Sequence, residues 1–391
     1  IQLERSLLLS LLYLQGRCPG ENDLVPDAAS SQMLRLACPC PAGEAGADGA
    51  VEPSVHLASL FSRHFRALLD TILASSLKTQ GLPENTAPEQ IEWAADSVSK
   101  SAFDTLIRTA PAEAWKHHEL ILTVMVPQVQ LPAIAAHDTP EAHLETYKAQ
   151  RGDTDVNQDA QNASTRLSLM ALLETWVRRG AQDWNCGAHL SEAASTILKK
   201  IVCGSLVWRV GRVEATVRKV TLAVTHALLR AGAVKPATLY EVAGELVPQI
   251  TSQMDDHETS VRHMSALCLN VVFERLKGAF GYQAVSELYP MLIKRLDDSN
   301  DEVRVQACKA LGAFMAAASA GAYSGTALDY TLDQLFIHLD DPDAAIQAVV
   351  YEVIIIGVTL NKDLVWKKAH ENLATHRTTA MCDRLIRELK G

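Results

Sequence analysis

The densest group of chemically capable side chains is the stretch DDSNDE at residues 297–302, which carries four carboxylates in six positions. Clustered carboxylates are ligands for Ca²⁺ and Mg²⁺, and paired carboxylates carry out general acid/base catalysis. An EF-hand loop needs glycine at its sixth position and glutamate at its twelfth. Counted from Asp297 these positions hold Glu302 and Cys308, and the register one residue later also fails. A polar turn has no apolar pocket to raise the pKa of one carboxyl, so we expect neither a metal site nor an acid/base pair here.

The stretch recurs along the chain, which indicates an architectural role. RLDDSNDEVR begins at Arg295, QMDDHETSVR at Gln253 and HLDDPDAAIQ at His338, and a fainter copy, RVGRVEATVR, begins at Arg209. From the faint copy onward, successive copies begin 44, 42 and 43 residues apart. Such a period is typical of repeat proteins, in which each unit packs on its neighbours.

Each copy leads into the apolar spacing of a helix. From Val303, apolar residues recur at offsets of 4, 7, 8 and 11, and the same offsets from Val217, Val261 and Ile346 also meet uncharged residues. Because these positions lie on one face of an α-helix, each copy predicts a helix, here called B, that buries this face.

An apolar segment also precedes each clear copy and predicts a first helix, here called A, that runs antiparallel to B. Pro248 and Pro290 occupy the same place in two A helices, where proline is expected to bend the helix. The acidic turn then joins A to B. Its Ser, Asn and Asp side chains can cap the first N–H groups of helix B, and its negative charge favours the positive end of that helix dipole.

The turns carry a repeated aspartate, followed seven residues later by an arginine in two of the copies. Stacked units would place a row of these arginines beside a row of aspartates along one edge. Gln347 replaces the arginine in the last copy, so the row is expected to thin toward the C-terminus. The repeated positions are Asp255, Arg262, Asp297, Arg304 and Asp340.

Composition favours a soluble helical protein. The 391 residues are 48% hydrophobic but only 5% aromatic, which suits packed helices better than sheets. A net charge of −10 argues against nucleic-acid binding as the main activity. Eight cysteines are too sparse for a disulfide framework and fit a reducing, cytoplasmic location. No stretch reaches the roughly 18 consecutive apolar residues of a membrane span.

The chain divides into a short helical start, a loop and a long repeat region. We expect residues 1–16 to end a preceding repeat helix, and residues 17–55, rich in Gly, Pro and Ala, to form a disordered loop. Residues 56–391 are expected to form the repeat array, with an inserted polar loop at 137–160 and a C-terminal cap at 360–391. Since the sequence begins without methionine and within a helix, we expect it to be the C-terminal part of a longer chain. Helices ahead of the insert are expected at 56–80, 89–110 and 112–130.

Other groups of reactive residues make weak sites. Cys18, Cys38 and Cys40 resemble zinc ligands, but the close pair has one intervening residue, and no clear fourth ligand follows. The run HHE at residues 117–119 lacks the i, i+4 histidines of a zinc protease, so we interpret it as a solvated helix end. Nucleotide-binding glycine loops and hydrolase nucleophile motifs are absent from the sequence. We therefore expect no catalytic residue, no metal and no cofactor.

One segment departs from the acidic background. Between Lys199 and Lys235 there are eight basic residues and one acidic residue, Glu214, a net charge of +7 that leaves −17 for the rest of the chain. Two interpretations stay open: a solvated basic face, or a docking surface for an acidic partner, because Arg and Trp are favoured anchors in protein interfaces. The candidate contact residues are Trp208, Arg209, Arg212, Arg218 and Lys219.

The period, the paired helices, the proline in helix A and the D…VR turn resemble HEAT repeats. This resemblance implies an all-α fold, a right-handed α-solenoid of the armadillo-like α-α superhelix type. The segments LVWRVGRVEATVRK, LYPMLIKRLDDSNDEVRVQACKALGAF, HLDDPDAAIQ and HRTTAMCDRLIREL are similar to HEAT-repeat axonemal dynein assembly factors. That similarity implies a cytoplasmic, non-enzymatic scaffold for preassembly of the outer and inner dynein arms of motile cilia. It also implies a dynein intermediate chain as partner, with co-chaperone machinery as a further one.

Two other functional classes remain open alongside this reading. The first is a HEAT-repeat adaptor of another pathway, such as a transport receptor or a phosphatase regulatory scaffold. The second is a helical-repeat enzyme acting on nucleic acid, against which the acidic balance and the lack of a catalytic cluster argue. We expect no nucleic acid, no membrane and no small-molecule substrate among the partners.

Overall fold

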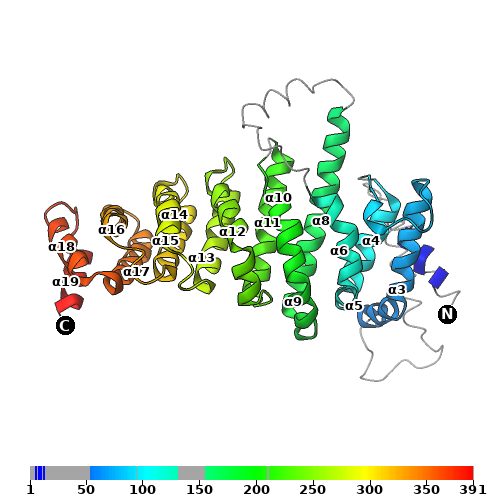
Figure 1. The fold of residues 1–391 in the computed structure, drawn as a ribbon, viewed down its shortest axis with the longest axis horizontal. Helices are drawn as coiled ribbons and strands as arrows, with labels where there is room; N and C mark the ends of the chain where they lie inside the picture. The colour runs from blue at the N-terminus through cyan, green and yellow to red at the C-terminus, as the bar shows by residue number, and fades with distance from the viewer. Residues whose placement is uncertain are drawn as a thin grey trace. The chain divides into compact units, whose positions relative to one another are not determined.

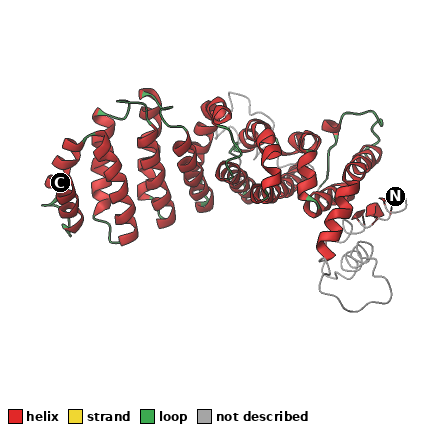
Figure 2. Cartoon of the chain, turned by 90° about the horizontal axis from the view of Figure 1, so that it is seen from below, coloured by secondary structure: helices red, strands yellow, loops and turns green. Residues whose placement is uncertain are grey.

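In the computed structural model, helices joined by loops and turns make up the described residues (Figure 2). Within these residues, β-type pairing is limited to one isolated bridge between Phe280 and Ala318. The chain forms two compact units, Ile1–Ala233 and Val234–Gly391. The all-α prediction is therefore confirmed. The described residues are 5–6, 8–10, 12–13, 53–94, 96–130, 155–208 and 211–390.

The second unit consists of helical hairpins, each with an acidic turn between its two helices, and Figure 1 shows them following one another from yellow-green to red. Each hairpin is a helix A followed by a helix B, as the repeat predicts. The A helices are α12 (Pro236–Ser252), α14 (Tyr282–Lys294) and α16 (Gly325–Leu339). The B helices are α13 (Thr259–Arg275), α15 (Asp301–Ala317) and α17 (Ala344–Leu360). Short helices η4 (Gln253–Asp255) and η5 (Arg295–Asp297) begin two of the turns, and α18 (Lys362–Asn372) and α19 (Ala380–Lys390) end the unit.

Burial follows the predicted apolar stripe. Val303 and the four positions at offsets of 4, 7, 8 and 11 from it are all fully buried in α15. The equivalent positions after Val217, Val261 and Ile346 are buried as well. The periodic spacing therefore predicts the buried face of each B helix correctly.

The predicted helix caps are present in two of the three clear copies. The side chain of Asn300 accepts a hydrogen bond of 3.1 Å from the backbone N–H of Val303 at the start of α15. The side chain of Asp343 accepts one of 2.7 Å from Ala345 at the start of α17. Glu258 stands at the same place before α13 and makes no such bond, because its longer side chain is a poor N-cap.

Neighbouring hairpins also meet at the ends of the B helices that lie away from the acidic turns. The backbone N–H of Gly278, after α13, donates to the carbonyl of Ala317 at the end of α15 over 2.8 Å. Phe273, Phe280 and Phe314 pack together there, with ring centroids between 4.8 and 5.3 Å apart. The hairpins α12–α13 and α14–α15 are thus also joined at the ends of their B helices.

Near the start of the first unit, the described residues 5–6, 8–10 and 12–13 are helical, and Leu8 and Leu12 are buried. The α-helices of the rest of the unit range from one short turn to nearly thirty residues. They are α3 (Pro53–Thr79), α4 (Val98–Thr109), α5 (Pro111–Lys116), α6 (His118–Val129), α8 (Asp155–Gln182), α9 (Gly187–Thr196), α10 (Cys203–Ser205) and α11 (Arg212–Arg230). Short helical segments are η1 (Pro88–Gln90), η2 (Trp184–Cys186) and η3 (Ile197–Val202), the last of which is π-helical.

Two boundaries in the first unit differ from the sequence prediction. The helix predicted for 89–110 begins only at Val98, because Trp93 is buried in a non-helical segment before it. Ser97 then caps the helix by accepting a hydrogen bond of 3.3 Å from the backbone of Lys100. The helix predicted for 112–130 is divided at His117 into α5 and α6.

The two predicted loops fall mostly outside the described residues. Of the loop expected at 17–55, the structure describes only the last three residues, which belong to α3. Of the insert expected at 137–160, it describes the part from Asp155 onward, and this part is already helical in α8.

Helices α5 and α8 of the first unit pack through two tryptophans. The rings of Trp115 and Trp176 stack with centroids 4.0 Å apart. A Cβ atom added to Gly180 would lie 2.3 Å from the indole nitrogen of Trp115, so only glycine allows α8 to approach this closely. Among the helices that the structure describes, none has the length and apolar character needed to cross a membrane.

Substitution of Leu311 tests the packing of the second unit. Leu311 is fully buried in α15, so Leu311→Ala removes packed atoms and leaves a cavity. We expect the free energy of unfolding, measured by urea denaturation, to fall by about 2 to 5 kcal/mol. Since each hairpin contacts its neighbours, hydrogen exchange should show early opening of α13, α15 and α17.

Leu360→Ala is the matched control, because Leu360 is 40% exposed at the end of α17. Its effect should stay within about 0.5 kcal/mol. An unchanged urea midpoint for Leu311→Ala would contradict the packing described here.

Candidate functional site

In the second unit, aspartates of the acidic turns form ion pairs with basic side chains of neighbouring hairpins. Arg262 donates from Nε to Oδ2 of Asp298 over 2.7 Å and from Nη2 to Oδ1 over 2.8 Å. The two side chains are only 9% and 1% exposed. Burial raises the pKa of Asp298, but the hydrogen bonds from Arg262 and from the Asn300 backbone outweigh it and hold that pKa below its usual range. This carboxylate is therefore charged and fully engaged.

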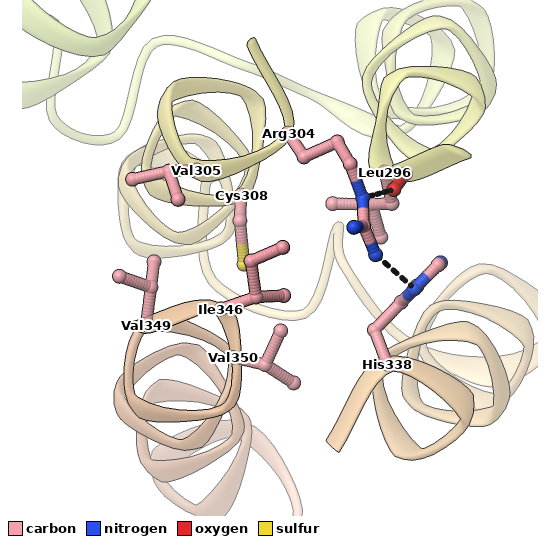
Figure 3. A pocket seen from close by; sticks show the side chains of 8 residues that line it. All are labelled: Leu296, Arg304, Val305, Cys308, His338, Ile346, Val349 and Val350. Atoms are coloured by element: carbon pink, nitrogen blue, oxygen red, sulfur yellow. Dashed lines mark hydrogen bonds between the residues drawn. The ribbon is translucent and has the colours of Figure 1, made fainter. Parts of the chain in front are cut away.

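The next turn repeats the arrangement. Arg304 donates to Asp341 of the following hairpin, and its Nε also donates to the Leu296 carbonyl over 2.8 Å (Figure 3). Its Nη2 lies 3.4 Å from Nδ1 of His338. Desolvation lowers the pKa of Arg304, but the hydrogen bonds to aspartates raise it overall. In the last turn Gln347 takes the place of the arginine and donates to the Asp341 carbonyl over 2.7 Å.

The second aspartate of each turn also fixes the turn to which it belongs. In all three turns its Oδ1 accepts a hydrogen bond from the backbone N–H two residues further along. Asp298 and Asp341 therefore close their own turns and hold the arginine of the preceding hairpin. The turn contacts are Asp256 with Glu258 (2.9 Å), Asp298 with Asn300 (3.1 Å) and Asp341 with Asp343 (2.8 Å).

The first aspartate of each turn faces the next hairpin from a more exposed position. Hydrogen bonds from the backbone and side chain of Arg377 and from the backbone of Thr378 lower the pKa of Asp340 to about 2, with the Arg377 backbone the largest cause. The pairs are Asp255 with Arg295 (2.8 Å), Asp297 with His338 (3.5 Å) and Asp340 with Arg377 (3.1 Å). The pKa of His338 is lowered, mainly by burial of its side chain.

One detail of the predicted rows needs correction. The seven-residue spacing placed the arginines beside Asp255 and Asp297, whereas Arg262 and Arg304 bind the second aspartate of the next turn. The reason is burial: the Asp298 side chain is 1% exposed and the Asp297 side chain is 74% exposed. Adjacent aspartates in a turn point in different directions, and spacing alone does not say which one faces inward.

Side chains fill the contact between the hairpins α14–α15 and α16–α17. Leu296, Val305, Ile346 and Val350 pack around the Cys308 thiol, and the space that they enclose is too small for a water molecule (Figure 3). Burial raises the pKa of Cys308 to about 12, so its thiol stays protonated at neutral pH. The stretch DDSNDE and its surroundings therefore form a structural joint.

An open groove of about 380 Å³ lies over helices α13, α15 and α17. Its lining includes the small residues Gly312 and Ala316 and charged side chains such as Lys309 and Glu352. A Cβ atom added to Gly312 would lie 2.9 Å from Val353, so this glycine lets α15 and α17 pack closely beneath the groove.

The five residues of the predicted basic docking surface differ in their exposure to solvent. Arg218 is only 3% exposed, and this burial excludes it from a docking surface. Arg209 lies outside the described residues. Trp208 is 38% exposed, and Arg212 and Lys219 are exposed seven residues apart on one face of α11. Of the five candidate residues, the structure thus shows Trp208, Arg212 and Lys219 exposed.

Sequence analysis missed one group of residues in the first unit. The run HHE was interpreted as a solvated helix end, but His118 is only 8% exposed, so that interpretation is wrong for this residue. His118 lies near His189 and Glu192 of α9. The spacing of His189 and Glu192, three residues apart on one helix, was the available signal, but nothing in the sequence brings α9 to α6.

Comparisons with known proteins agree with this geometry. The family model described as "HEAT repeat" matches residues 288–318, which include most of α14, the acidic turn and α15. The fold class is therefore that of all-α HEAT-repeat proteins.

The chain is 27% identical over 237 residues to dynein axonemal assembly factor 5 of Homo sapiens, a match that covers 60% of this chain and 28% of that protein. It is 24% identical to the Mus musculus protein of the same name, with the same coverage, and 24% identical to that of Xenopus laevis, covering 59% of this chain and 28% of the relative. The predicted resemblance is confirmed, and the match spans little more than a quarter of these relatives.

Solved structures with a similar fold are more distant. A crystal structure of an engineered protein is 13% identical with a TM-score of 0.43, covering 74% of this chain and 96% of that one. The crystal structure of Kap121p is 14% identical with a TM-score of 0.40, covering 99% of this chain and half of that one. Likenesses at these TM-scores carry no conclusion about function.

Substitution of two adjacent aspartates tests the assignment of the buried partner. Asp298→Asn leaves the buried Arg262 guanidinium without its counterion, which should lower the free energy of unfolding by about 3 kcal/mol. Asp297→Asn changes an exposed carboxylate and should cost less than about 1 kcal/mol. Urea denaturation of both variants measures the difference, and equal losses would show that the buried pair does not matter.

Proposed function

We propose that this chain is part of a cytoplasmic, non-enzymatic scaffold in the preassembly of outer and inner axonemal dynein arms. The observation that carries the proposal is the 27% identity to dynein axonemal assembly factor 5 over 237 residues. The name of that relative supplies the assembly of axonemal dynein, and the outer and inner arms are part of our proposal. The HEAT-type hairpins support the scaffold part of the proposal, because such arrays present long surfaces to other proteins.

The ion pairing and burial of the reactive side chains also support a scaffold over an enzyme. Asp298 and Asp341 are engaged with arginines, and the buried Cys308 thiol has a raised pKa. These are the groups that a nucleophilic or acid/base mechanism would need to have free at a pocket. The open groove over α13, α15 and α17 offers contact area in place of such a pocket.

We further propose a dynein intermediate chain as the direct partner, with co-chaperone machinery as a second one. The exposed residues Trp208, Arg212 and Lys219 support contact with an acidic segment of that partner. Arginine and tryptophan are the residues that most often anchor interfaces, and their neighbourhood is basic in an otherwise acidic chain.

Affinity capture from cells that are building motile cilia tests this proposal. The tagged full chain should recover a dynein intermediate chain, identified by mass spectrometry. Arg212→Glu with Lys219→Glu should lower that recovery roughly tenfold, since two interface charge reversals together cost more than 1.4 kcal/mol. The matched control is Lys362→Glu with Lys367→Glu, two exposed lysines on α18, which should leave recovery unchanged.

The possible outcomes separate the two levels of the proposal. Equal recovery by both double variants, with folding verified by circular dichroism, would leave the scaffold in place and contradict the docking position. Absence of dynein subunits, together with recovery of a transport cargo or a phosphatase subunit, would contradict the assembly role.

A further inference from the structure

Three side chains of the first unit gather as a metal-ligand set. His118 belongs to α6, and His189 and Glu192 belong to α9; each offers one ligand atom, and these atoms lie within 4.8 Å of one another. Nδ1 of His189 is 3.5 Å from Oε2 of Glu192, and the two histidine rings have centroids 5.9 Å apart. Because His189 and Glu192 are three residues apart on one helix, they project from the same face toward His118.

The buried histidine is already oriented for a metal ion. His118 is 8% exposed, and its Nδ1 lies 2.8 Å from the backbone carbonyl of Trp115. A carbonyl only accepts hydrogen bonds, so Nδ1 carries the proton, and the lone pair of Nε2 is left available. Metal-binding histidines are held in this way, by a second hydrogen bond that fixes the tautomer and the ring. The stacking of Trp115 on Trp176 keeps the carbonyl in place.

The other two residues leave the group accessible from solvent. The side chain of His189 is 37% exposed and that of Glu192 is 61% exposed. A groove of about 320 Å³ lies beside His118 and Glu192, lined also by Glu119, Thr123 and Lys200. An ion can therefore reach the group, and a water molecule or a donor from a partner protein has room at a remaining coordination position.

We propose that His118, His189 and Glu192 form a zinc site with one exchangeable position. Two imidazoles and one carboxylate suit Zn²⁺ at bond lengths of about 2.0 to 2.2 Å, whereas Ca²⁺ and Mg²⁺ prefer oxygen ligands throughout. Binding brings the donor atoms closer together than 4.8 Å, and the exposed side chains of His189 and Glu192 are free to make this movement while His118 stays fixed. The bound ion would tie α6 to α9.

Metal titration of the purified full chain tests the site. After treatment with a chelator, the protein should bind one equivalent of Zn²⁺ in competition with a chromophoric chelator. Co²⁺ at the same site should give visible absorption bands, which report direct coordination. His189→Ala should weaken zinc binding at least tenfold and remove the cobalt bands, and Glu192→Gln should weaken binding as well. These residues are chosen because their exposed side chains are not needed for folding, which circular dichroism verifies.

Two controls decide between this site and other sources of zinc binding. His257→Ala removes an exposed histidine of the second unit and should leave binding unchanged. Cys38→Ser with Cys40→Ser removes the cysteine pair and should also leave it unchanged. Wild-type affinity in His189→Ala, loss of zinc only in the cysteine variant, or no binding at micromolar Zn²⁺ would each overturn the proposal.

Discussion

The second unit depends on a buried ion pair that joins one acidic turn to the next. The guanidinium of Arg262 binds both carboxylate oxygens of Asp298 and also donates to the carbonyls of Asp256 and His257 in its own turn, at 2.9 and 3.0 Å. One side chain therefore connects two turns. Burying such a pair is tolerable only when hydrogen bonds satisfy both partners, and this requirement fixes how adjacent hairpins are aligned. Arg304 and Asp341 repeat the arrangement one hairpin later.

This constraint explains how clustered carboxylates can have a structural role in place of a catalytic one. The aspartates of the turns neutralise arginine or close a turn, and the thiol beside them is buried. Other molecules can reach solvent-exposed regions, such as the groove over α13, α15 and α17 and the exposed start of α11. The scaffold role that we propose from the similarity to dynein axonemal assembly factor 5 would use surfaces of this kind. A zinc ion between α6 and α9 would add a metal-dependent contact to the first unit.

The sequence predicted the parts of the fold that depend on local spacing. The buried stripe from Val303 and the caps at Asn300 and Asp343 follow from helix geometry, which repeats every few residues. The sequence did not reveal which aspartate Arg262 binds, or that His118 is buried beside α9, because both depend on contacts between distant segments. Trp93 shows the same limit: tertiary burial holds its segment out of the helix that the apolar spacing favours.

A double-mutant cycle between Arg262 and Asp298 tests the central claim most directly. The cycle combines Arg262→Met with Asp298→Asn and measures the free energy of unfolding of the wild type, both single variants and the double variant. The account predicts a coupling energy of about 1.5 kcal/mol or more for this pair, and one within about 0.5 kcal/mol when Asp297→Asn replaces Asp298→Asn. A coupling energy near zero for Arg262 and Asp298, or an equal value for both cycles, would contradict it.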